Sequence, residues 1–298
     1  MLLTKIARHL KPRPFITPQQ WYLRASSTTT TTTTPEQAPE IFMDIVDEAF
    51  LDNESNIASI INTTKPYTVI DNFFPSDVIT QLRQEAVHLR KQGNFVTSQS
   101  ERNGVTYEKH NVEAMQLDGG DIYYDAPRLH EYVVQAARTL PSLLSNGDID
   151  LDGTYAANKL AVCFGNGASY DKHLDNSGNG DTRKLTCLLY LNEVDTYNSK
   201  LGGEFRLWYH DDDTNKEQII DIEPKGGRMI CFFSDSLVHA VMPTTIGSEA
   251  DHRYALTVWL PTAKGVGDIE EDKVKEEYHW GEGSTLANEI GDNTIERI

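Results

Sequence analysis

The sequence lacks several features that would have assigned it to a class of protein at once. No uninterrupted apolar run reaches the roughly 18 residues that a helix needs to cross a bilayer, so we expect no membrane-spanning segment. Positive charge is also scarce, because 27 lysines and arginines stand against 45 aspartates and glutamates, which gives a formal net charge of −18 at pH 7. Such a chain repels polyanions, and nucleic acid is therefore not an expected partner.

Cysteine is nearly absent. The 298 residues include three cysteines, Cys163, Cys187 and Cys231, which are widely spaced and each lie in an apolar stretch. An odd number of isolated thiols does not fit a disulfide framework or a zinc cluster, so we expect reduced, buried thiols and a reducing compartment. Several catalytic motifs are missing as well: HExxH, GxSxG, the P-loop, and GxGxxG after a strand.

Acidic residues are missing from the first 35 positions, which carry five basic residues and a hydroxyl-rich tract at 26–34. This composition is typical of a mitochondrial transit peptide. An unstructured basic arm without a targeting role, on a cytoplasmic protein, remains the alternative. We assign residues 1–35 as a basic targeting segment with a Thr-rich linker, which cannot bury an apolar face.

The next part of the chain is expected to support a later domain. Residues 36–65 form a linker or a loose helix, because their apolar pattern is weak. Residues 66–153 form a helical support region, which starts with a short strand at 67–70. An amphipathic helix then runs up to Gly93 from an N-cap offered by Pro75-Ser76-Asp77.

Two further expectations concern polar segments around this region. The stretch at 97–111 has no strong periodicity and predicts a mobile loop or ribbon. Asp125 is the expected cap of a second helix over about 126–140. At the other end of the chain, residues 264–298 are acidic and poor in apolar residues, which predicts a partly disordered tail.

Short β-rich runs dominate the part between these segments, residues 154–263. Turn signals such as Gly202-Gly203 and Gly226-Gly227 separate the runs. Helices followed by many short strands predict a mostly β fold with bracing helices, either a β-sandwich or an open barrel. The predicted strands are 159–164, 184–191, 204–208, 218–222, 228–233, 238–242 and 254–260.

Three residues in this β-rich part could hold a metal. His173 and Asp175 are two positions apart, so in an extended segment their side chains share a face. His239 lies 64 residues further along and could join them from a facing strand. Two imidazoles and a carboxylate leave positions open on a metal, as in non-haem iron(II) oxygenases. Hydrolytic zinc sites use similar ligands, and a chance pairing of surface residues fits the spacing equally well.

Arg253 begins a strand-like run in which it shares one face with Ala255 and Thr257. A buried arginine is costly unless it meets an anion, and its guanidinium matches a carboxylate in a bidentate fashion. A dicarboxylate such as 2-oxoglutarate is therefore a natural ligand. An arginine that reaches solvent from a strand end gives the same pattern.

A series of longer motifs follows in order between residues 157 and 261. They are Tyr170-Asp-Lys-His-Leu-Asp-Asn, Thr186-Cys-Leu-Leu-Tyr-Leu-Asn, Gly202-Gly203, Asp221-Ile-Glu-Pro, the stretch 228–235, His239 and the stretch 253–259. Together they resemble the prolyl 4-hydroxylase family, and within it the oxygen-sensing prolyl hydroxylases. The resemblance implies a double-stranded β-helix, or jelly-roll, and an Fe(II)/2-oxoglutarate dioxygenase core at 154–263.

The same resemblance implies a role for individual residues. His173, Asp175 and His239 would bind Fe(II), while Arg253 and the hydroxyl of Tyr190 would hold the distal carboxylate of the cosubstrate 2-oxoglutarate. Thr257, on the strand face of Arg253, is a further candidate contact. Asn176 would either steady the iron ligands or form a turn. O₂ would be the oxidant, ascorbate the reductant, and a prolyl residue of a protein or peptide the substrate, with succinate and CO₂ as co-products.

Two departures from the family pattern stand out. His239 and Arg253 are fourteen positions apart, with an apparent insertion at 244–251, which puts the strand register in question. Phe164 stands where the animal enzymes have a tyrosine near the cosubstrate, so we expect one hydrogen bond fewer. Alternatives to a prolyl hydroxylase are a dioxygenase of a small molecule or another residue type, and a non-catalytic jelly-roll binding module.

Overall fold

The computed structural model describes residues 39–62, 65–102, 105–144, 149–154, 156–176, 178, 180–193, 199–211, 215–245, 248–262 and 295–298. These residues form a seven-stranded sheet in the order β1-β9-β6-β11-β4-β3-β2 and a five-stranded sheet in the order β12-β8-β7-β10-β5. The strands are β1 (Tyr67–Ile70), β2 (Val96–Arg102), β3 (Val105–Met115), β4 (Ala157–Cys163), β5 (Tyr170–His173), β6 (Arg183–Tyr190), β7 (Phe205–Asp211), β8 (Lys216–Ile222), β9 (Met229–Phe233), β10 (Val238–Val241), β11 (Arg253–Pro261) and β12 (Ile295–Arg297).

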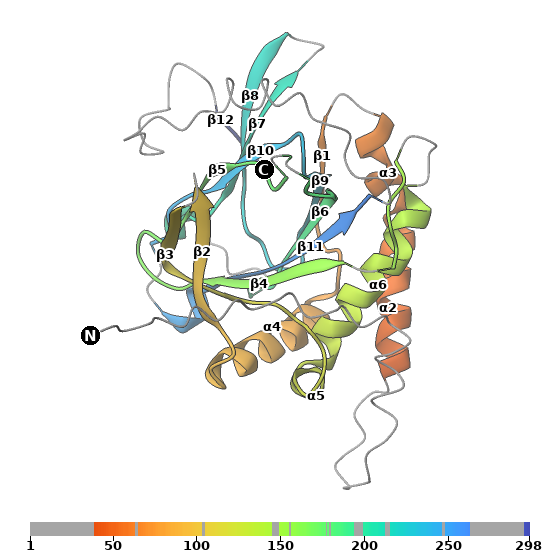
Figure 1. The fold of residues 1–298 in the computed structure, drawn as a ribbon, viewed down its shortest axis with the longest axis vertical. Coiled ribbons are helices and arrows are strands. Elements are labelled where there is room, and N and C mark those ends of the chain that lie inside the picture. Colours follow the sequence, from red (N-terminus) through yellow and green to blue (C-terminus); the bar gives the residue numbers. More distant parts are fainter. Residues whose placement is uncertain are drawn as a thin grey trace, which may run out of the picture.

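Helices cover one side of the larger sheet, and the smaller sheet lies on its other side (Figure 1). The helices are α2 (Pro39–Asp52), α3 (Glu54–Asn62), α4 (Ser76–Lys91), α5 (Ile122–Asp125) and α6 (Pro127–Leu143), with short 3-10 turns at Ser199–Leu201 and Glu249–Asp251. This arrangement confirms the mostly β, helix-braced jelly-roll. None of the described helices is long and apolar enough to span a bilayer.

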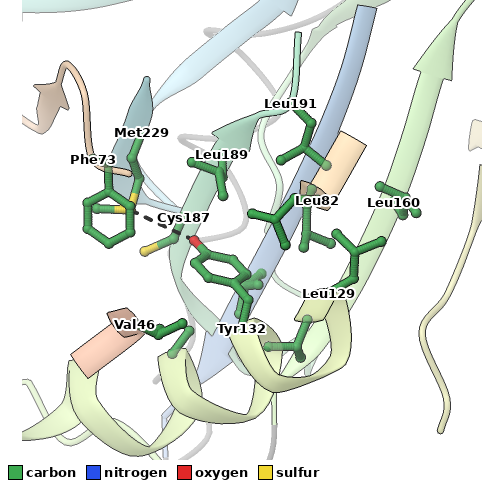
Figure 2. Close-up of a cluster of buried hydrophobic side chains, with 14 of the residues drawn as sticks. Val46, Phe73, Leu82, Leu129, Tyr132, Leu160, Cys187, Leu189, Leu191 and Met229 are labelled. Carbon is green, nitrogen blue, oxygen red and sulfur yellow. Dashed lines mark hydrogen bonds between the residues drawn. The ribbon is translucent and has the colours of Figure 1, made fainter. Parts of the chain in front are cut away.

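The two faces of the larger sheet serve different purposes. Along β11, Tyr254, Leu256, Val258 and Leu260 pack into the cluster shared with the helices. Ala255 belongs to a second cluster, formed between the two sheets. Because side chains of a strand alternate between faces, the odd-numbered residues of β11 point away from the helices. Figure 2 shows the helix side, where the Tyr132 hydroxyl donates a hydrogen bond to Met229 Sδ at 3.8 Å.

Residues 36–65 are more ordered than the sequence pattern suggested. Of the two predicted alternatives, the linker is wrong for most of this region and the helix is confirmed, because the region contains α2 and α3, which are firmly packed. Val46, Phe50 and Ile57 are fully buried there. Few apolar residues suffice because they meet the aromatic side chains of Phe73 and Tyr132, which lie outside the region.

Both predicted helix caps are wrong. Neither the start of α4 nor that of α6 has a side-chain cap hydrogen bond, and Asp125 instead ends α5. At α6 the carboxylate of Glu85 replaces the cap, because it accepts hydrogen bonds from the backbone N–H of Arg128 at 3.2 Å and of Leu129 at 2.9 Å. A carboxylate at this end is also favoured by the helix dipole.

The polar stretch at 97–111 was predicted to be a mobile loop or a ribbon. The structure shows a ribbon, because β2 and β3 pair in antiparallel fashion.

The prediction for the C-terminal tail is wrong for its last residues. Ile295–Arg297 form β12, which pairs with β8 in parallel. The carbonyl of Ile298 accepts a hydrogen bond from the buried Arg228. The targeting segment 1–35 and the tail positions 264–294 lie outside the described residues.

The insertion at 244–251 does not disturb the strand register. His239 pairs with His173, and Arg253 pairs with Cys163. Arg83 of α4 secures the intervening turn, because its guanidinium donates to the carbonyls of Ala250 at 2.8 Å and His252 at 3.2 Å. The end of the inserted stretch, at 250–252, is thus bound to the helical layer, and both strands remain paired.

Candidate metal centre and cosubstrate pocket

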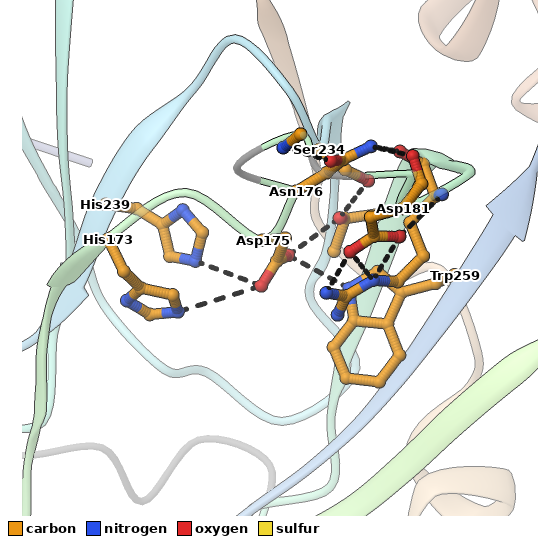
Figure 3. Close-up of polar contacts among 10 residues, drawn as sticks. His173, Asp175, Asn176, Asp181, Ser234, His239 and Trp259 are labelled. Atoms are coloured by element: carbon orange, nitrogen blue, oxygen red, sulfur yellow. Dashed lines mark hydrogen bonds and ion pairs between the residues drawn. The ribbon is translucent and has the colours of Figure 1, made fainter. Parts of the chain in front are cut away.

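The structure brings together the three residues proposed as metal ligands. His173 ends β5, His239 lies opposite it in β10, and Asp175 follows β5 by two residues. One ligand atom from each residue lies within 4.8 Å of the others. Figure 3 shows the two imidazoles on one side of the Asp175 carboxylate. Distant parts of the sequence therefore meet at one point between the sheets.

The histidines are oriented by backbone carbonyls. Nδ1 of His173 lies 2.6 Å from the carbonyl oxygen of Asp171, and Nδ1 of His239 lies 3.0 Å from that of Leu237. A carbonyl only accepts hydrogen bonds, so each Nδ1 carries the proton. Each Nε2 then presents a lone pair, and both lie 3.7 Å from Oδ1 of Asp175. Fixing the ring in this tautomer prepares it to bind a metal.

The carboxylate of Asp175 is held from its other oxygen. Oδ2 accepts hydrogen bonds from Thr186 Oγ1 at 2.7 Å and from Trp259 Nε1 at 3.0 Å, which leaves Oδ1 toward the histidines. Burial alone raises the pKa of Asp175, but His239, His173 and the Trp259 hydrogen bond reverse this effect and lower it. The group is therefore a carboxylate at neutral pH.

His239 lies in the most enclosed position of the three. Its ring stacks on Phe205 with centroids 4.8 Å apart and meets Phe232 edge-on at 4.9 Å. Burial, and then the neighbouring His173, lower the pKa of His239 to about 4. A neutral imidazole at physiological pH is the form that binds a metal. The donor set of two imidazoles and one carboxylate thus fits Fe(II).

Arg253 and Tyr190 lie in the same interior. Arg253 is 4% exposed, and its Nη2 donates to the Tyr190 hydroxyl at 3.2 Å while Nε donates to the carbonyl of Gly203 at 3.0 Å. Burial raises the pKa of Tyr190, so its hydroxyl keeps the proton that it can donate to a carboxylate. These two side chains can hold the distal end of a dicarboxylate.

Gly203 makes room for this arginine. Its φ of +80° is rarely adopted by residues with a side chain, and a Cβ atom there would lie 3.1 Å from Cδ of Arg253 and 2.9 Å from Cγ2 of Thr244. The turn signal seen in the sequence is therefore also a requirement of the pocket.

Thr257 and Asn176 take different positions. Thr257 lies on the face of β11 that carries Arg253, opposite Leu188 of β6. Asn176 is fully buried, accepts a hydrogen bond from the Gly178 N–H at 2.8 Å and donates to the carbonyl of Asp181 at 3.0 Å. Its side chain forms the turn after the ligands, and its own N–H donates to the carbonyl of Ser234.

Phe164 does not line the cosubstrate pocket. Its ring lies beneath the guanidinium of Arg90 and packs edge-on against His252, on the helix side of the sheet. Cys163 is the residue that faces Arg253, as its direct cross-strand partner. Without the strand register, the sequence did not reveal which of two adjacent residues points inward.

Other residues of the site were missed or misjudged from the sequence. The indole N–H of Trp259 donates a hydrogen bond to Asp175, a contact that was not identified from the sequence. Its spacing of two from Thr257, on the strand face of Arg253, was the available signal. Lys109, Lys159 and Tyr170 also gather beside the metal centre. Nothing in the sequence places Lys109 there, because it comes from the ribbon.

Comparison with known proteins agrees with this geometry. Residues 159–261 match the 2OG-Fe(II) oxygenase superfamily. The chain is 31% identical over 228 residues to Egl nine homolog 1 of Homo sapiens, which covers 72% of this chain and 47% of that protein. The chain spans about half the length of the curated relatives it matches.

Two solved structures share the fold. A Pseudomonas putida prolyl-4-hydroxylase superposes with a TM-score of 0.55 at 22% identity, covering 71% of this chain and 100% of that one. A Trichoplax adhaerens prolyl hydroxylase, in complex with a hypoxia inducible factor peptide fragment, gives 0.55 at 21% identity, covering 82% and 98%. From the matched domain and these relatives, we conclude that residues 159–261 form a 2OG-Fe(II) oxygenase domain and that the chain is similar in sequence to prolyl hydroxylases.

Proposed function

We propose that the chain is an Fe(II)- and 2-oxoglutarate-dependent dioxygenase that hydroxylates prolyl residues of a protein or peptide, with succinate and CO₂ as co-products. One observation carries the proposal: His173, Asp175 and His239 share an interior with the Arg253–Tyr190 pair. The similarity to Egl nine homolog 1 supports prolyl residues as the target.

Each residue of the site has a defined task in this proposal. The Nε2 atoms of His173 and His239 and Oδ1 of Asp175 hold Fe(II), which when bound supplies the activation of O₂ coupled to oxidative decarboxylation of 2-oxoglutarate. Arg253 and Tyr190 bind the distal carboxylate and fix the direction in which the cosubstrate reaches the metal. Phe205 and Phe232 flank His239 and limit the access of water on that side.

A reductant and a location complete the proposal. Ascorbate would keep the iron in its reduced form between turnovers, as the family resemblance implies. The basic composition of residues 1–35 supports import into mitochondria. Fusing these residues to a fluorescent reporter tests the location, and a diffuse cytosolic signal would contradict it.

The chemistry is tested without knowing the substrate. The full chain is loaded with Fe(II) and 2-oxoglutarate under argon, metal binding is measured, and succinate is followed after air is admitted. We expect slow succinate release from the wild type and neither binding nor release from His173→Ala. His210→Ala removes an exposed histidine on β7 and serves as the matched control.

The possible outcomes separate the rival functions. Succinate formation that rises with proline peptides, together with a mass gain of one oxygen on the peptide, supports the proposed activity. Succinate formation that no peptide stimulates would favour a small-molecule substrate. A wild type that binds neither metal nor 2-oxoglutarate would contradict the proposal and favour a binding module.

A further inference from the structure

Two lysines lie beside the metal centre and have no role in the reaction described above. Lys109 comes from β3 and Lys159 from β4. Lys159 is the cross-strand partner of Thr257, so its side chain is on the face of the sheet that carries Arg253. Tyr170 starts the strand that ends in His173 and packs against the cluster that contains Cys163.

The two ammonium groups share one aromatic ring. Nζ of Lys109 lies 4.0 Å from the ring centroid of Tyr170, and Nζ of Lys159 lies 5.1 Å from it. Both distances are within the range of a cation–π contact. Lys159 also donates a hydrogen bond to the hydroxyl of Ser98, a buried residue of β2, at 3.1 Å. Three neighbouring strands of the larger sheet and β5 of the smaller one therefore contribute to one basic cluster, Ser98, Lys109, Lys159 and Tyr170.

The charge of this cluster is not balanced locally. Within the described part of the chain, neither lysine forms an ion pair, and the one hydrogen bond of Lys159 goes to a neutral hydroxyl. The carboxylates that act on them, Asp171 and Asp175, are too distant for ion pairs, and Asp175 is engaged at the metal site. Burial, and then the charge of Lys159, lower the pKa of Lys109 to about 8. Two partly buried cations side by side are costly without an anion.

The anion is not the distal carboxylate of 2-oxoglutarate, because Arg253 and Tyr190 already provide for that group. Its other carboxylate belongs with the metal. A further anion at this position must come from the molecule that is oxidised. The ribbon brings Lys109 to this position from a segment whose neighbouring residues Glu108 and His110 are exposed, and the side chains of Lys109 and Lys159 are themselves only partly buried.

We propose that Lys109 and Lys159, steadied by Tyr170 and Ser98, bind a carboxylate side chain of the peptide substrate and thereby select substrates with an aspartate or glutamate close to the target residue. The inference rests on the proposed function, since it assumes a peptide substrate. It assigns to this basic cluster a part in substrate selection that the iron ligands and the cosubstrate pocket do not provide.

The test compares peptides that differ only in charge. The full chain is loaded with Mn(II) and 2-oxoglutarate under argon, so that binding is measured without turnover. It is then presented with proline-centred peptides in matched pairs, with Asp or Glu replaced by Asn or Gln at each flanking position. We expect at least one position where the acidic peptide binds about tenfold more tightly, which corresponds to about 1.4 kcal/mol.

Variants assign this preference to the cluster. Lys109→Met and Lys159→Met, made singly and together, should abolish the acidic preference while the affinity for the amide peptide is kept. Lys159→Arg preserves the charge and should preserve the preference. Lys91→Met, which removes a largely exposed lysine of α4, is the matched control and should bind like the wild type. Thermal unfolding of each variant verifies that it is folded.

The outcomes are unambiguous. An acidic preference that the single or double methionine variants lose supports the inference. A wild type without acidic preference at any position, without any bound peptide, or with a preference that survives in the double variant overturns it. Binding of free carboxylates alone would also leave the peptide pairs indistinguishable and overturn it. Succinate release with and without peptide is measured in parallel with the wild type: if a proline peptide raises it, only this inference fails, and if no peptide raises it or the protein binds neither metal nor 2-oxoglutarate, the proposed function fails as well.

Discussion

The indole N–H of Trp259 donates to Oδ2 of Asp175 at 3.0 Å, from a strand of the opposite sheet to the one that carries the histidines. Thr186 binds the same oxygen. The carboxylate is therefore held by the larger sheet and presents its free oxygen to the smaller one, so that the metal centre spans both layers.

Removing this hydrogen bond should weaken metal binding. Trp259→Phe keeps an aromatic ring but loses the donor, and we expect affinity for Fe(II) or Mn(II) to fall by about 10- to 100-fold, the usual effect of losing a partner that orients a ligand. Anaerobic metal titration measures the change, with Trp208→Phe on β7 as control. Equal affinity in Trp259→Phe and the wild type would show that Thr186 alone is sufficient.

The cosubstrate pocket should respond unequally to its two polar residues. Arg253→Met removes the charge that meets the carboxylate, and we expect the KM for 2-oxoglutarate to rise by about 30-fold or more, since breaking a buried charge pair costs about 2–5 kcal/mol. Tyr190→Phe removes one neutral donor and should raise KM only about fivefold, or about 1 kcal/mol. A larger effect for Tyr190→Phe than for Arg253→Met would contradict the assignment.

Acid should weaken one contact between the end of β1 and the start of β9, which are neighbours in the larger sheet. Two nitrogens of Arg228 donate to the carboxylate of Asp71, and these hydrogen bonds keep the pKa of Asp71 below its ordinary value of 3.8. A carboxylate with a lowered pKa stabilises the fold above that ordinary value, and the contribution disappears as pH falls through the pKa of the folded state.

Asp71→Asn should therefore lower the free energy of unfolding at pH 7 by about 1 kcal/mol, a value reduced from that of a buried charged pair because Asp71 is half exposed. The difference from the wild type should shrink below about pH 4, where the carboxylate begins to take up a proton. Urea unfolding at both pH values measures it, and Asp44→Asn on the exposed side of α2 is the control. A difference that is constant with pH would exclude the ion pair as its cause.

The three cysteines should be unreactive in the folded protein. All are fully buried, and burial raises the pKa of the Cys163 and Cys187 thiols, which suppresses the reactive thiolate. We expect a thiol reagent to label none within minutes and all three in guanidinium. Among the slow reactions Cys163 should be the first, because it faces the cosubstrate pocket, and 2-oxoglutarate should delay it. Labelling that 2-oxoglutarate does not affect would place Cys163 outside the pocket.

Much of the fold followed from local patterns. Alternating and helical apolar spacing identified most of the strands of the core and the helices α4 and α6, because these elements bury one face each. Prediction failed for the caps and was only partly right for residues 36–65, where the decisive partners come from elsewhere in the chain. Glu85 caps α6 across a gap of more than 40 residues, and no local pattern contains that information.

The candidate site was also predicted only in part from the sequence. His173, Asp175, His239, Arg253 and Tyr190 were found through motifs, and the structure brings them together. Which neighbour points inward was not evident, as the exchange of Phe164 for Cys163 shows. Lys109 and Lys159 were missed because they come from different strands. The sequence does not show that two such residues lie close together until the pairing of the strands is known.

The alternation along β11 has a consequence for how this protein tolerates change. Substitutions at 254, 256, 258 and 260 alter the packing under the helices, whereas those at 253, 257 and 259 alter the catalytic interior. If each residue of β11 were substituted in turn, the effects should alternate from one position to the next. Substitutions at one set of positions should reduce the amount of folded protein, and those at the other set should reduce turnover in protein that is still folded. Substitutions at 253, 257 and 259 could therefore change the preference for a substrate without reducing the stability that the residues at 254, 256, 258 and 260 provide.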